Sequence, residues 1–507
     1  MLDKERTLLV VIFVATTGML VDAHEHPDRN HGHHLAYVED QTHIFAVPTV
    51  FEPLDKEENK PRVIVTTSSY EPIDVFVTVE GIDFTQGGRV SKNKQVEISL
   101  PKSVRLSSPN EISNKTVVVQ ASGVINVHCI DNEYESGDGF LAFPNSQLST
   151  KYYIMSYDPF FHEKEYNPGF MCVSALEDGT VVEIQNLKSG QKTLVPLDSW
   201  ESFRYEGGFF DDLTGTEITS NKPVSVVSGI FTRVPHGYPK GADGLLEQIP
   251  PVNTWGSSFV LSPFRGRATG YVYRVLASTK KAKLTISNQP NAIIIRADEW
   301  FEDHVDGDTV ISINSDQPVL VFQYMKSNQG DELFEPSMMM VPPTDSYDNS
   351  VITFPVFNCT FENNFQYNIH VIIDCAYAND LMLDDDTPMK DWEQLKTKDN
   401  RMCVLRGNVS TGVHSVSHED PAAKFTVAVY GLHKVSSYAY PAGYKPVKKD
   451  GERKTSLSPG LVVGLILFVA LLLLFIVAVL VMRFRRRQRN TPKPSNEIYT
   501  TLENQSL

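Results

Sequence analysis

The sequence predicts an all-β protein, a tandem array of about four related β-sandwich-like modules followed by one C-terminal transmembrane helix. Three observations support this prediction. Short runs of β-branched and aromatic residues alternate with turn residues over most of the chain. Two sequence patterns return at intervals of about one hundred residues, which indicates internal repeats. A long uncharged apolar segment near the C-terminus has the length of a membrane-spanning helix.

The composition limits the class of protein. Hydrophobic residues make up 41% and charged residues 21% of the 507 residues, as is typical of globular proteins rather than disordered or fibrous ones. The net charge of −16 argues against a nucleic acid partner, because such partners are bound by a surplus of Lys and Arg. Five cysteines are too few for a disulfide-dense scaffold.

Residues 1–23 have the pattern of a secretory signal peptide. Lys4 and Arg6 precede an apolar run over 8–20, and VDA at 21–23 fits a cleavage site between small residues. An uncleaved N-terminal anchor is the alternative. We therefore expect the mature chain to begin at His24 and to be exported.

Residues 24–62 form a leader and linker that is rich in histidine near its start, at His24, His26, His31, His33 and His34. Imidazoles at this density can bind Zn²⁺ or Cu²⁺. Cleavage after Ala23 would make His26 the third residue, a position suited to square-planar copper. We favour a polar leader without metal, and we expect no cofactor elsewhere in the chain.

Two patterns mark the repeats within residues 63–445. The first occurs three times with a weaker fourth copy: SNKTVVV at 113–119, SNKPVSV at 220–226, SDQPVLV at 315–321 and PAAKFTVAVYG at 421–431. The second occurs three times, each time ahead of an aromatic residue: FP at 143–144, IPP at 249–251 and VPP at 341–343. Matching intervals in two independent patterns indicate four related units.

Each repeat holds about seven candidate strands, such as 75–79 and 271–276, separated by turn clusters. This number favours a sandwich over a blade of a propeller-like ring, which usually has four strands, so the ring is the alternative. We expect Pro223 and Pro318 to open their strands, where a missing N–H costs least. Trp255 is expected to anchor the core.

The apolar segment at 461–482 is uncharged and can cross a hydrocarbon core of about 30 Å. Five arginines follow it directly, as the positive-inside rule expects: Arg483, Arg485, Arg486, Arg487 and Arg489. With an exported N-terminus, this arrangement predicts a single-pass type I protein of the cell membrane. The modules at 63–445 and a juxtamembrane linker at 446–460 are then extracellular, and 483–507 is a cytoplasmic tail.

Export allows disulfide bonds and glycosylation. The cysteines are Cys129, Cys172, Cys359, Cys375 and Cys403, which predicts two bridges and one remaining thiol. We expect Cys129 to pair with Cys172, and two of the other three to form the second bridge. Extracellular sequons begin at Asn114, Asn358 and Asn408, whereas the sequon at Asn504 is expected to stay unmodified.

The sequence contains none of the common hydrolase, P-loop or dinucleotide-binding motifs, so we expect a protein that is not an enzyme. Paired carboxylates such as Asp211-Asp212 and 384–386 are read as solvated turns, with calcium binding as the alternative. Arg265, Arg267 and Arg274 could form a ligand patch, but solvated strand edges are the favoured interpretation.

The tail carries Tyr499 and Leu502 in a Tyr-x-x-Leu pattern, which resembles an endocytic sorting signal. A phosphorylated Tyr499 could instead dock a cytoplasmic adaptor through its added charge. A chance match is the alternative.

Several stretches resemble the N-terminal domain of the IgGFc-binding protein family. They are DLTGTEITSNKPV at 212–224, LEQIPP at 246–251 with TWG at 254–256, YRVLAS at 273–278, PVLV at 318–321, PSM at 336–338 and YAYP at 438–441. The resemblance covers roughly residues 63–445. Unlike the long secreted members, this chain has no cysteine-rich von Willebrand D-type modules, ends in a membrane span and lacks a cysteine pair within 231–243.

The resemblance implies a non-enzymatic extracellular recognition or adhesion domain that binds a protein or glycan ligand. It assigns immunoglobulin binding to no residue of this chain. Together with the topology, it predicts a cell-surface adhesion glycoprotein. The alternatives are a structural surface or mucus-associated component without signalling and, less favoured, an ectoenzyme.

Overall fold

The structure is a computed structural model that describes residues 41–50, 60–133, 136–159, 161–162, 165–208, 211–232, 234, 241–278, 280–327, 334–358, 365–447, 478–483 and 485–486. The chain splits into two compact units, residues 1–448 and 449–507. The first unit contains all the described strands, and residues 478–483 and 485–486 of the second are helical.

Within these described residues, no helix has the length and apolar character that crossing a membrane requires. The predicted span at 461–482 falls mostly outside them, since only 478–482 are described. The predicted signal peptide, the histidines of the leader and the Tyr499 and Leu502 motif also lie outside the described residues.

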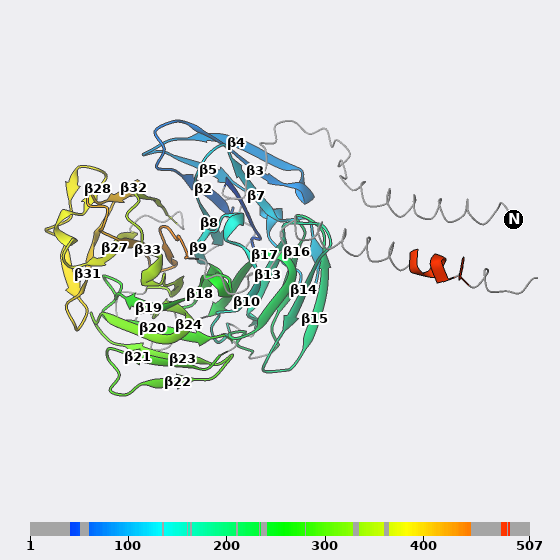
Figure 1. The fold of residues 1–507 in the computed structure, drawn as a ribbon. Helices are drawn as coiled ribbons and strands as arrows, with labels where there is room; N and C mark the ends of the chain where they lie inside the picture. The colour runs from blue at the N-terminus through cyan, green and yellow to red at the C-terminus, as the bar shows by residue number, and fades with distance from the viewer. Residues whose placement is uncertain are drawn as a thin grey trace, which may run out of the picture. The chain divides into compact units, whose positions relative to one another are not determined.

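Module 1 consists of two four-stranded sheets (Figure 1). The first has the order β1 (Thr42–Phe45), β7 (Val117–Ala121), β3 (Ile73–Val79) and β4 (Phe84–Val90). The second has the order β5 (Gln95–Ser99), β2 (Arg62–Thr66), β8 (Asn126–Glu133) and β9 (Ser136–Ala142). Inward-facing residues of both sheets, among them Val75, Val119 and Val127, share one buried core. Module 1 is therefore a sandwich.

Modules 2 and 3 repeat this plan, but one long strand replaces the pair β7 and β8. Module 2 contains β10 (Ser149–Tyr153), β13 (Phe170–Ala175), β14 (Thr180–Gln185), β15 (Lys192–Leu197), β16 (Ser202–Glu206), the long strand β17 (Glu217–Thr232) and β18 (Asp243–Gln248). Module 3 contains β19 (Gly256–Leu261), β20 (Tyr271–Ala277), β21 (Ala282–Ile286), β22 (Ile293–Ile295), β23 (Trp300–Val305), the long strand β24 (Ile311–Met325) and β25 (Ser337–Met340).

Module 4 again has two sheets. One has the order β26 (Ile352–Val356), β32 (Gly412–Ser417), β28 (Met382–Leu383) and β29 (Thr387–Pro388). The other has the order β30 (Glu393–Lys396), β31 (Met402–Asn408), β27 (Gln366–Asp374), β33 (Phe425–Leu432) and β34 (Ser437–Pro441). Two short pieces stand outside the four modules: β6 (Ile112–Ser113) pairs with β16, and β11 (Phe161–His162) forms a hairpin with β12 (Glu165–Tyr166).

The long strands show why proline is tolerated near their middle. In β17, residues 217–220 pair with β14 and residues 224–229 pair with β13, and Pro223 lies between these two segments. Pro318 holds the same place in β24, between its pairing with β21 and with β20. The prediction that both prolines open their strands is therefore wrong. They lie inside a strand, at the point where its pairing passes from one partner strand to the next and a missing N–H leaves no gap in either ladder.

The same register corrects one of the repeat assignments. The pattern at 220–226 leads into the segment of β17 that pairs with β13, whereas the pattern at 113–119 leads into β7, which pairs with β3. The structural counterpart of 220–226 in module 1 is therefore the segment that enters β8. The alignment of 113–119 with 220–226 is wrong, because 113–119 enters β7, the strand before β8. Equivalent turns precede β5, β16, β23 and β31, and each has one residue in the left-handed backbone conformation two positions before its strand: Asn93, Trp200, Asp298 and Asn400. These four equivalent turns confirm the fourfold repetition.

The last strands of the four modules contact one another in a closed cycle, β9 with β18, β18 with β25, β25 with β34 and β34 with β9. Figure 1 shows β9 and β18 between the four groups of strands. Module 4 also packs directly on module 1, where Ile64 and Ile130 join the core around Phe354. The array of sandwiches thus closes on itself. The favoured prediction of sandwich-like modules is confirmed. The ring, which was the alternative for the fold, describes the arrangement of these sandwiches instead.

Candidate functional site

Every junction between consecutive modules contains an arginine. Its guanidinium donates to a backbone carbonyl in the segment after the first strand of the preceding module. Arg204 donates to Thr49, Arg274 to Ser156, Arg406 to Pro263 and Arg62 to Asn358. Because these carbonyls follow β1, β10, β19 and β26 in turn, the four contacts occupy equivalent places in the fold.

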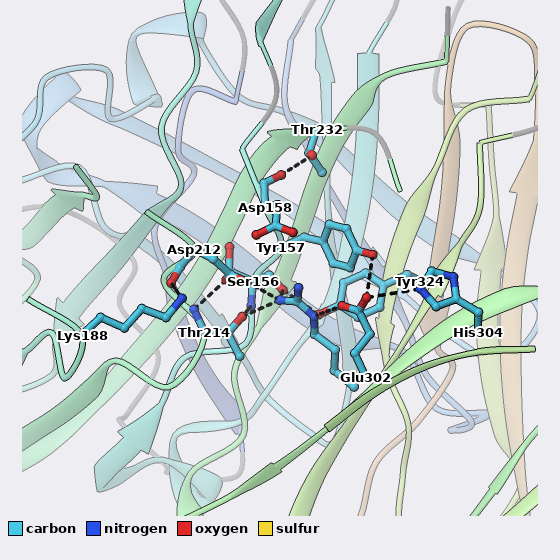
Figure 2. Close-up of polar contacts among 11 residues, drawn as sticks. Ser156, Tyr157, Asp158, Lys188, Asp212, Thr214, Thr232, Glu302, His304 and Tyr324 are labelled. Carbon is cyan, nitrogen blue, oxygen red and sulfur yellow. Dashed lines mark hydrogen bonds and ion pairs between the residues drawn. The ribbon is translucent and has the colours of Figure 1, made fainter. Parts of the chain in front are cut away.

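Among the described residues, the junction between modules 2 and 3 has an extensive polar network centred on Arg274 of β20. Figure 2 labels its partners Ser156, Asp212, Thr214 and Glu302. Its Nη1 lies 2.7 Å from Asp212 Oδ2, 2.8 Å from Thr214 Oγ1 and 2.9 Å from the carbonyl oxygen of Ser156. Its Nε lies 2.7 Å from Glu302 Oε2. The guanidinium also stacks over the Tyr157 ring, 4.2 Å from its centroid.

Burial and charge set the protonation of this network. Burial by itself lowers the pKa of Arg274, but the charge of Asp212 and the other neighbours hold it above its usual range. Burial raises the pKa of Asp212, but the charge of Arg274 and the hydrogen bonds from Thr214 together outweigh burial, so that this pKa lies below its usual range. The pair is therefore charged at neutral pH, and its role is to join two modules.

This network overturns two expectations. Asp212 was read as part of a solvated turn, but it is 4% exposed and paired with Arg274. The three-arginine patch is also wrong under both interpretations, because Arg267 and Arg274 are buried. Arg265 contacts Glu393 and Asn408 of module 4 instead. The sequence shows that Arg274 is charged, but it does not show that Asp212, about sixty residues away, pairs with it and so allows the charge to be buried.

A second buried polar group lies where the last strands begin. Oδ1 of Asp243 accepts hydrogen bonds from the Ser136 hydroxyl at 2.7 Å and the Gly137 amide at 2.9 Å, and Oδ2 accepts one from the Ser437 amide at 3.0 Å. Asp138 accepts from the Leu246 amide at 3.1 Å and the Ser337 hydroxyl at 3.2 Å. These two carboxyls therefore connect all four modules.

Desolvation dominates the titration of these groups. Burial raises the pKa of Asp243 to about 8 although its hydrogen bonds lower it, and burial raises the pKa of Asp138 and Glu247 well above their usual range. Oε1 of Glu247 has no hydrogen-bond partner among the described residues. Burial also lowers the pKa of Arg267, to about 9. Because their pKa values differ from those of the unfolded chain, these buried groups make the stability of the fold depend on pH. They have no access to solvent and therefore do not form a ligand site.

An open pocket of about 140 Å³ lies at the junction of modules 4 and 1. Apolar side chains line much of it: Val124, Ile125, Val351, Ile352 and Phe425. Asp348 and Lys445 also line it, and Lys445 Nζ lies 2.5 Å from Asp348 Oδ2 and 2.9 Å from Ser350 Oγ. Burial raises the pKa of Asp348, but contacts with Lys445 and Ser350 hold it below its usual range. The pocket is a place where a ligand could reach the modules.

Sequence reasoning missed this pocket. A signal was nevertheless present, because an aromatic residue follows the Pro-Pro patterns at 249–251 and 341–343 by a few residues, as Trp255 and Tyr347. After the YAYP stretch at 438–441, the residue at the same distance of four positions from the last proline is Lys445, which is not aromatic.

The predicted modification sites are placed as follows. Asn114, Asn358 and Asn408 are all exposed, as glycan acceptors must be. Cys375 and Cys403 form a disulfide, which confirms that two of the last three cysteines pair. Cys129 and Cys172 are buried free thiols, so the pairing expected between them is wrong: they belong to β8 and β13 of different modules. Cys359 lies outside the described residues.

The acidic run at 384–386 forms a turn, as expected. Asp384 accepts a hydrogen bond from the Ser415 amide at 2.9 Å, and its Oδ2 lies 2.7 Å from His414 Nδ1. Nε2 of His414 lies closer to the carbonyl oxygen of Ser410, at 3.0 Å, than to its hydroxyl, at 3.4 Å. This arrangement ties two turns of module 4 together. Within the described ranges, no group of three or more His, Cys, Asp or Glu could hold a metal ion.

Comparison with known proteins places the chain beside one family. The family model described as IgGFc binding protein matches residues 138–431, more than half of the chain and nearly all of modules 2 to 4. The human IgGFc-binding protein is 19% identical over 236 residues. That alignment covers 45% of this chain and 4% of the human protein, so the chain corresponds to a small part of that relative.

Proposed function

Because the chain belongs to the IgGFc-binding protein family, we propose that it is an extracellular recognition protein that presents its four modules at the cell surface. Residues 24–460 are outside the cell, 461–482 anchor the chain, and 483–507 face the cytoplasm. The match over 138–431 carries this proposal, because it covers most of the closed array of sandwiches. The exposure of Asn114, Asn358 and Asn408 and the Cys375–Cys403 disulfide suit an extracellular location.

The partner we propose is an extracellular protein. The printed name of the human relative describes binding to the Fc part of IgG, and the present chain corresponds to a small part of that protein. The surface of four modules is large enough for a protein partner. A structural surface component without a specific ligand is the alternative, and it would fit a closed, rigid array equally well.

Two measurements on cells that express the full-length chain test the proposal. Protease added to intact cells should remove modules 1 to 4 and leave the tail protected, and glycans should be found at Asn114, Asn358 and Asn408 but not at Asn504. The same cells should bind at least one member of a panel of extracellular proteins that includes immunoglobulin. Protection of the modules, or sugar at Asn504, would contradict the topology, and a blank panel would favour the structural alternative.

We also propose that the tail governs how long the protein stays at the surface. Tyr499→Ala should increase surface residence, measured by antibody uptake, because it removes the aromatic residue of the Tyr-x-x-Leu motif. Tyr499→Phe is the matched control for the phosphorylated form, since it keeps the ring but cannot accept phosphate. Unchanged uptake in both variants would remove the sorting role.

A further inference from the structure

The junctions between modules 1 and 2, 2 and 3, and 3 and 4 are closed in the same way. After the last strand of each module, the chain makes a short 3-10 turn: η4 (Asn145–Gln147), η5 (Val252–Thr254) and η6 (Thr344–Ser346). These turns contact the first strand of the same module, β1, β10 and β19 respectively. The turn is thus a repeated part of the fold.

A large apolar side chain directly follows each turn and fills the junction. Leu148 is 5% exposed, Trp255 is 2% exposed and Tyr347 is 5% exposed. Leu148 packs with Ile44 and Val118 of module 1 and with Leu176 and Trp200 of module 2. Tyr347 packs with Val260 of module 3 and Ile372 of module 4. We call these three residues the junction plugs.

The fourth junction has no described plug. Leu148 stands six residues after the end of β9, and Trp255 and Tyr347 stand seven residues after the ends of β18 and β25. The residues six and seven positions after the end of β34 are Val447 and Lys448, and Lys448, which is not apolar, lies outside the described residues. Val447 is 53% exposed, so it does not fill the junction. The pocket of about 140 Å³ lies at the corresponding place, since Thr67 in its wall follows β2 as Leu176 follows β13.

Part of the pocket wall suits an apolar occupant, although polar side chains such as Thr67, Asn126 and Thr426 line it as well. Val124 is 71% exposed and Val351 is 36% exposed, although both border a concave surface. Enclosed apolar cavities of about 150 Å³ hold one aromatic ring in other proteins. Covering these valines would remove apolar surface from water, which favours binding.

We propose that this pocket binds a turn of an extracellular partner protein that carries an exposed Trp or Tyr, which takes the place of the missing fourth plug. The inference rests on the proposed recognition function and names the site where it acts. The occupant is a polypeptide turn rather than a glycan, because the three equivalent junctions are all filled by a 3-10 turn followed by an apolar side chain. Asp348 and Lys445 at the pocket offer charges that a partner's polar groups can pair with.

The chain itself supplies a probe, the peptide of residues 249–256, which contains a plug and its turn. Its binding to the purified full-length chain in phospholipid nanodiscs can be measured by fluorescence anisotropy. We expect saturable binding to the wild type, and a loss of at least about tenfold in affinity for Val124→Glu, because the bound peptide would cover this position and remove the new carboxylate from water. The same peptide with Trp255→Ala should bind weakly.

Leu194→Glu is the matched control, because Leu194 is a 66% exposed apolar residue on β15, away from the pocket. It should bind the peptide as the wild type does. Val351→Glu provides a second pocket variant if Val124→Glu lowers the unfolding temperature. Absence of saturable binding, equal binding by both peptides, or equal affinity of Val124→Glu and Leu194→Glu would overturn the proposal.

Two other occupants would also overturn it. If the wild type is a dimer without peptide and Val124→Glu makes it monomeric, the occupant is a second copy. If the peptide binds only after removal of residues 448–460, the chain fills its own pocket. Because the assay uses purified protein, its failure would leave the topology intact, whereas protection of the modules from protease on cells would defeat the recognition function and leave peptide binding unaffected.

Discussion

The junction between modules 2 and 3 and the junction between modules 4 and 1 use equivalent strands but are filled differently. At the first, Trp255 is buried against Tyr153, with ring centroids 6.1 Å apart, and Arg274 makes a four-partner polar network. At the second, Arg62 retains the equivalent contact with the Asn358 carbonyl, but the plug position is exposed and a pocket is open. A closed array of repeats therefore differs most where the chain enters and leaves it.

The largest expected difference concerns the plug. Trp255→Ala should lower the free energy of unfolding by about 3–5 kcal/mol, because it leaves a cavity between two modules. Val447→Ala, the matched change at the fourth junction, should have almost no effect, because Val447 is half exposed. Denaturant unfolding of both variants measures the difference. Equal effects would show that the two junctions are not built differently.

The arginine network gives a change of similar size. Arg274→Met should cost about 3–5 kcal/mol in unfolding free energy, because it leaves Asp212 as a buried charge without its partner. The double variant Arg274→Met with Asp212→Asn should recover much of this loss, since neither charge remains. A double-mutant cycle by chemical denaturation gives the coupling. If the double variant is no more stable than the single one, the ion pair is not what joins modules 2 and 3.

A smaller effect depends on pH. His43, His128 and His370 are buried, and burial lowers the pKa of His128 and His370 to about 3 and that of His43 to about 4. Below pH 6.5 the unfolded chain binds protons that the folded chain does not, so each histidine lowers stability as the pH falls from 6.5 towards its folded pKa. The stability difference between pH 7 and pH 5 should shrink by about 2 kcal/mol in His128→Phe.

Glu247 provides the control of opposite sign. Burial raises its pKa, so above its usual range the unfolded chain has lost a proton that the folded chain keeps, and stability falls as the pH rises. Glu247→Gln should therefore remove a fall in stability that begins near the ordinary carboxyl pKa and continues as the pH rises towards the raised pKa, a slope opposite to that of His128. Thermal unfolding from pH 5 to pH 9 separates the two variants. A His128→Phe curve parallel to the wild type would contradict the buried neutral histidine.

The smallest effect is expected at the pocket. Lys445→Met should change the unfolding free energy by less than about 1 kcal/mol, because the pair with Asp348 is largely exposed, with the Lys445 side chain 63% in solvent. The comparison with Arg274→Met then distinguishes two kinds of ion pair. The Arg274–Asp212 pair stabilises a junction between modules, whereas the Lys445–Asp348 pair contributes little to stability. A loss as large as that of Arg274→Met would mean that the fourth junction depends on Lys445.

Much of the fold followed from local patterns, but the candidate site did not. Val181 to Ile184 alternates in exposure as a strand should, and the aromatic residues after the Pro-Pro patterns became the plugs Trp255 and Tyr347. The prediction that Pro223 opens a strand fails because a local rule contains no information about a strand whose partner changes along its length, as that of β17 does. Cys129 and Cys172 were paired for their order along the chain, although they belong to different modules.

The sequence by itself determined the β class and the number of modules, because strand periodicity, turn residues and repeat intervals are properties of neighbouring residues. It placed the start of the array at residue 63, whereas β1 (Thr42–Phe45) already pairs with β7 of module 1. Tertiary structure alone decided that module 4 closes on module 1, that Arg274 is buried beside Asp212, and that one junction stays open. These features depend on contacts between residues far apart in the chain, such as Asn126 and Thr353, whose hydrogen bond at 3.0 Å joins the first module to the last.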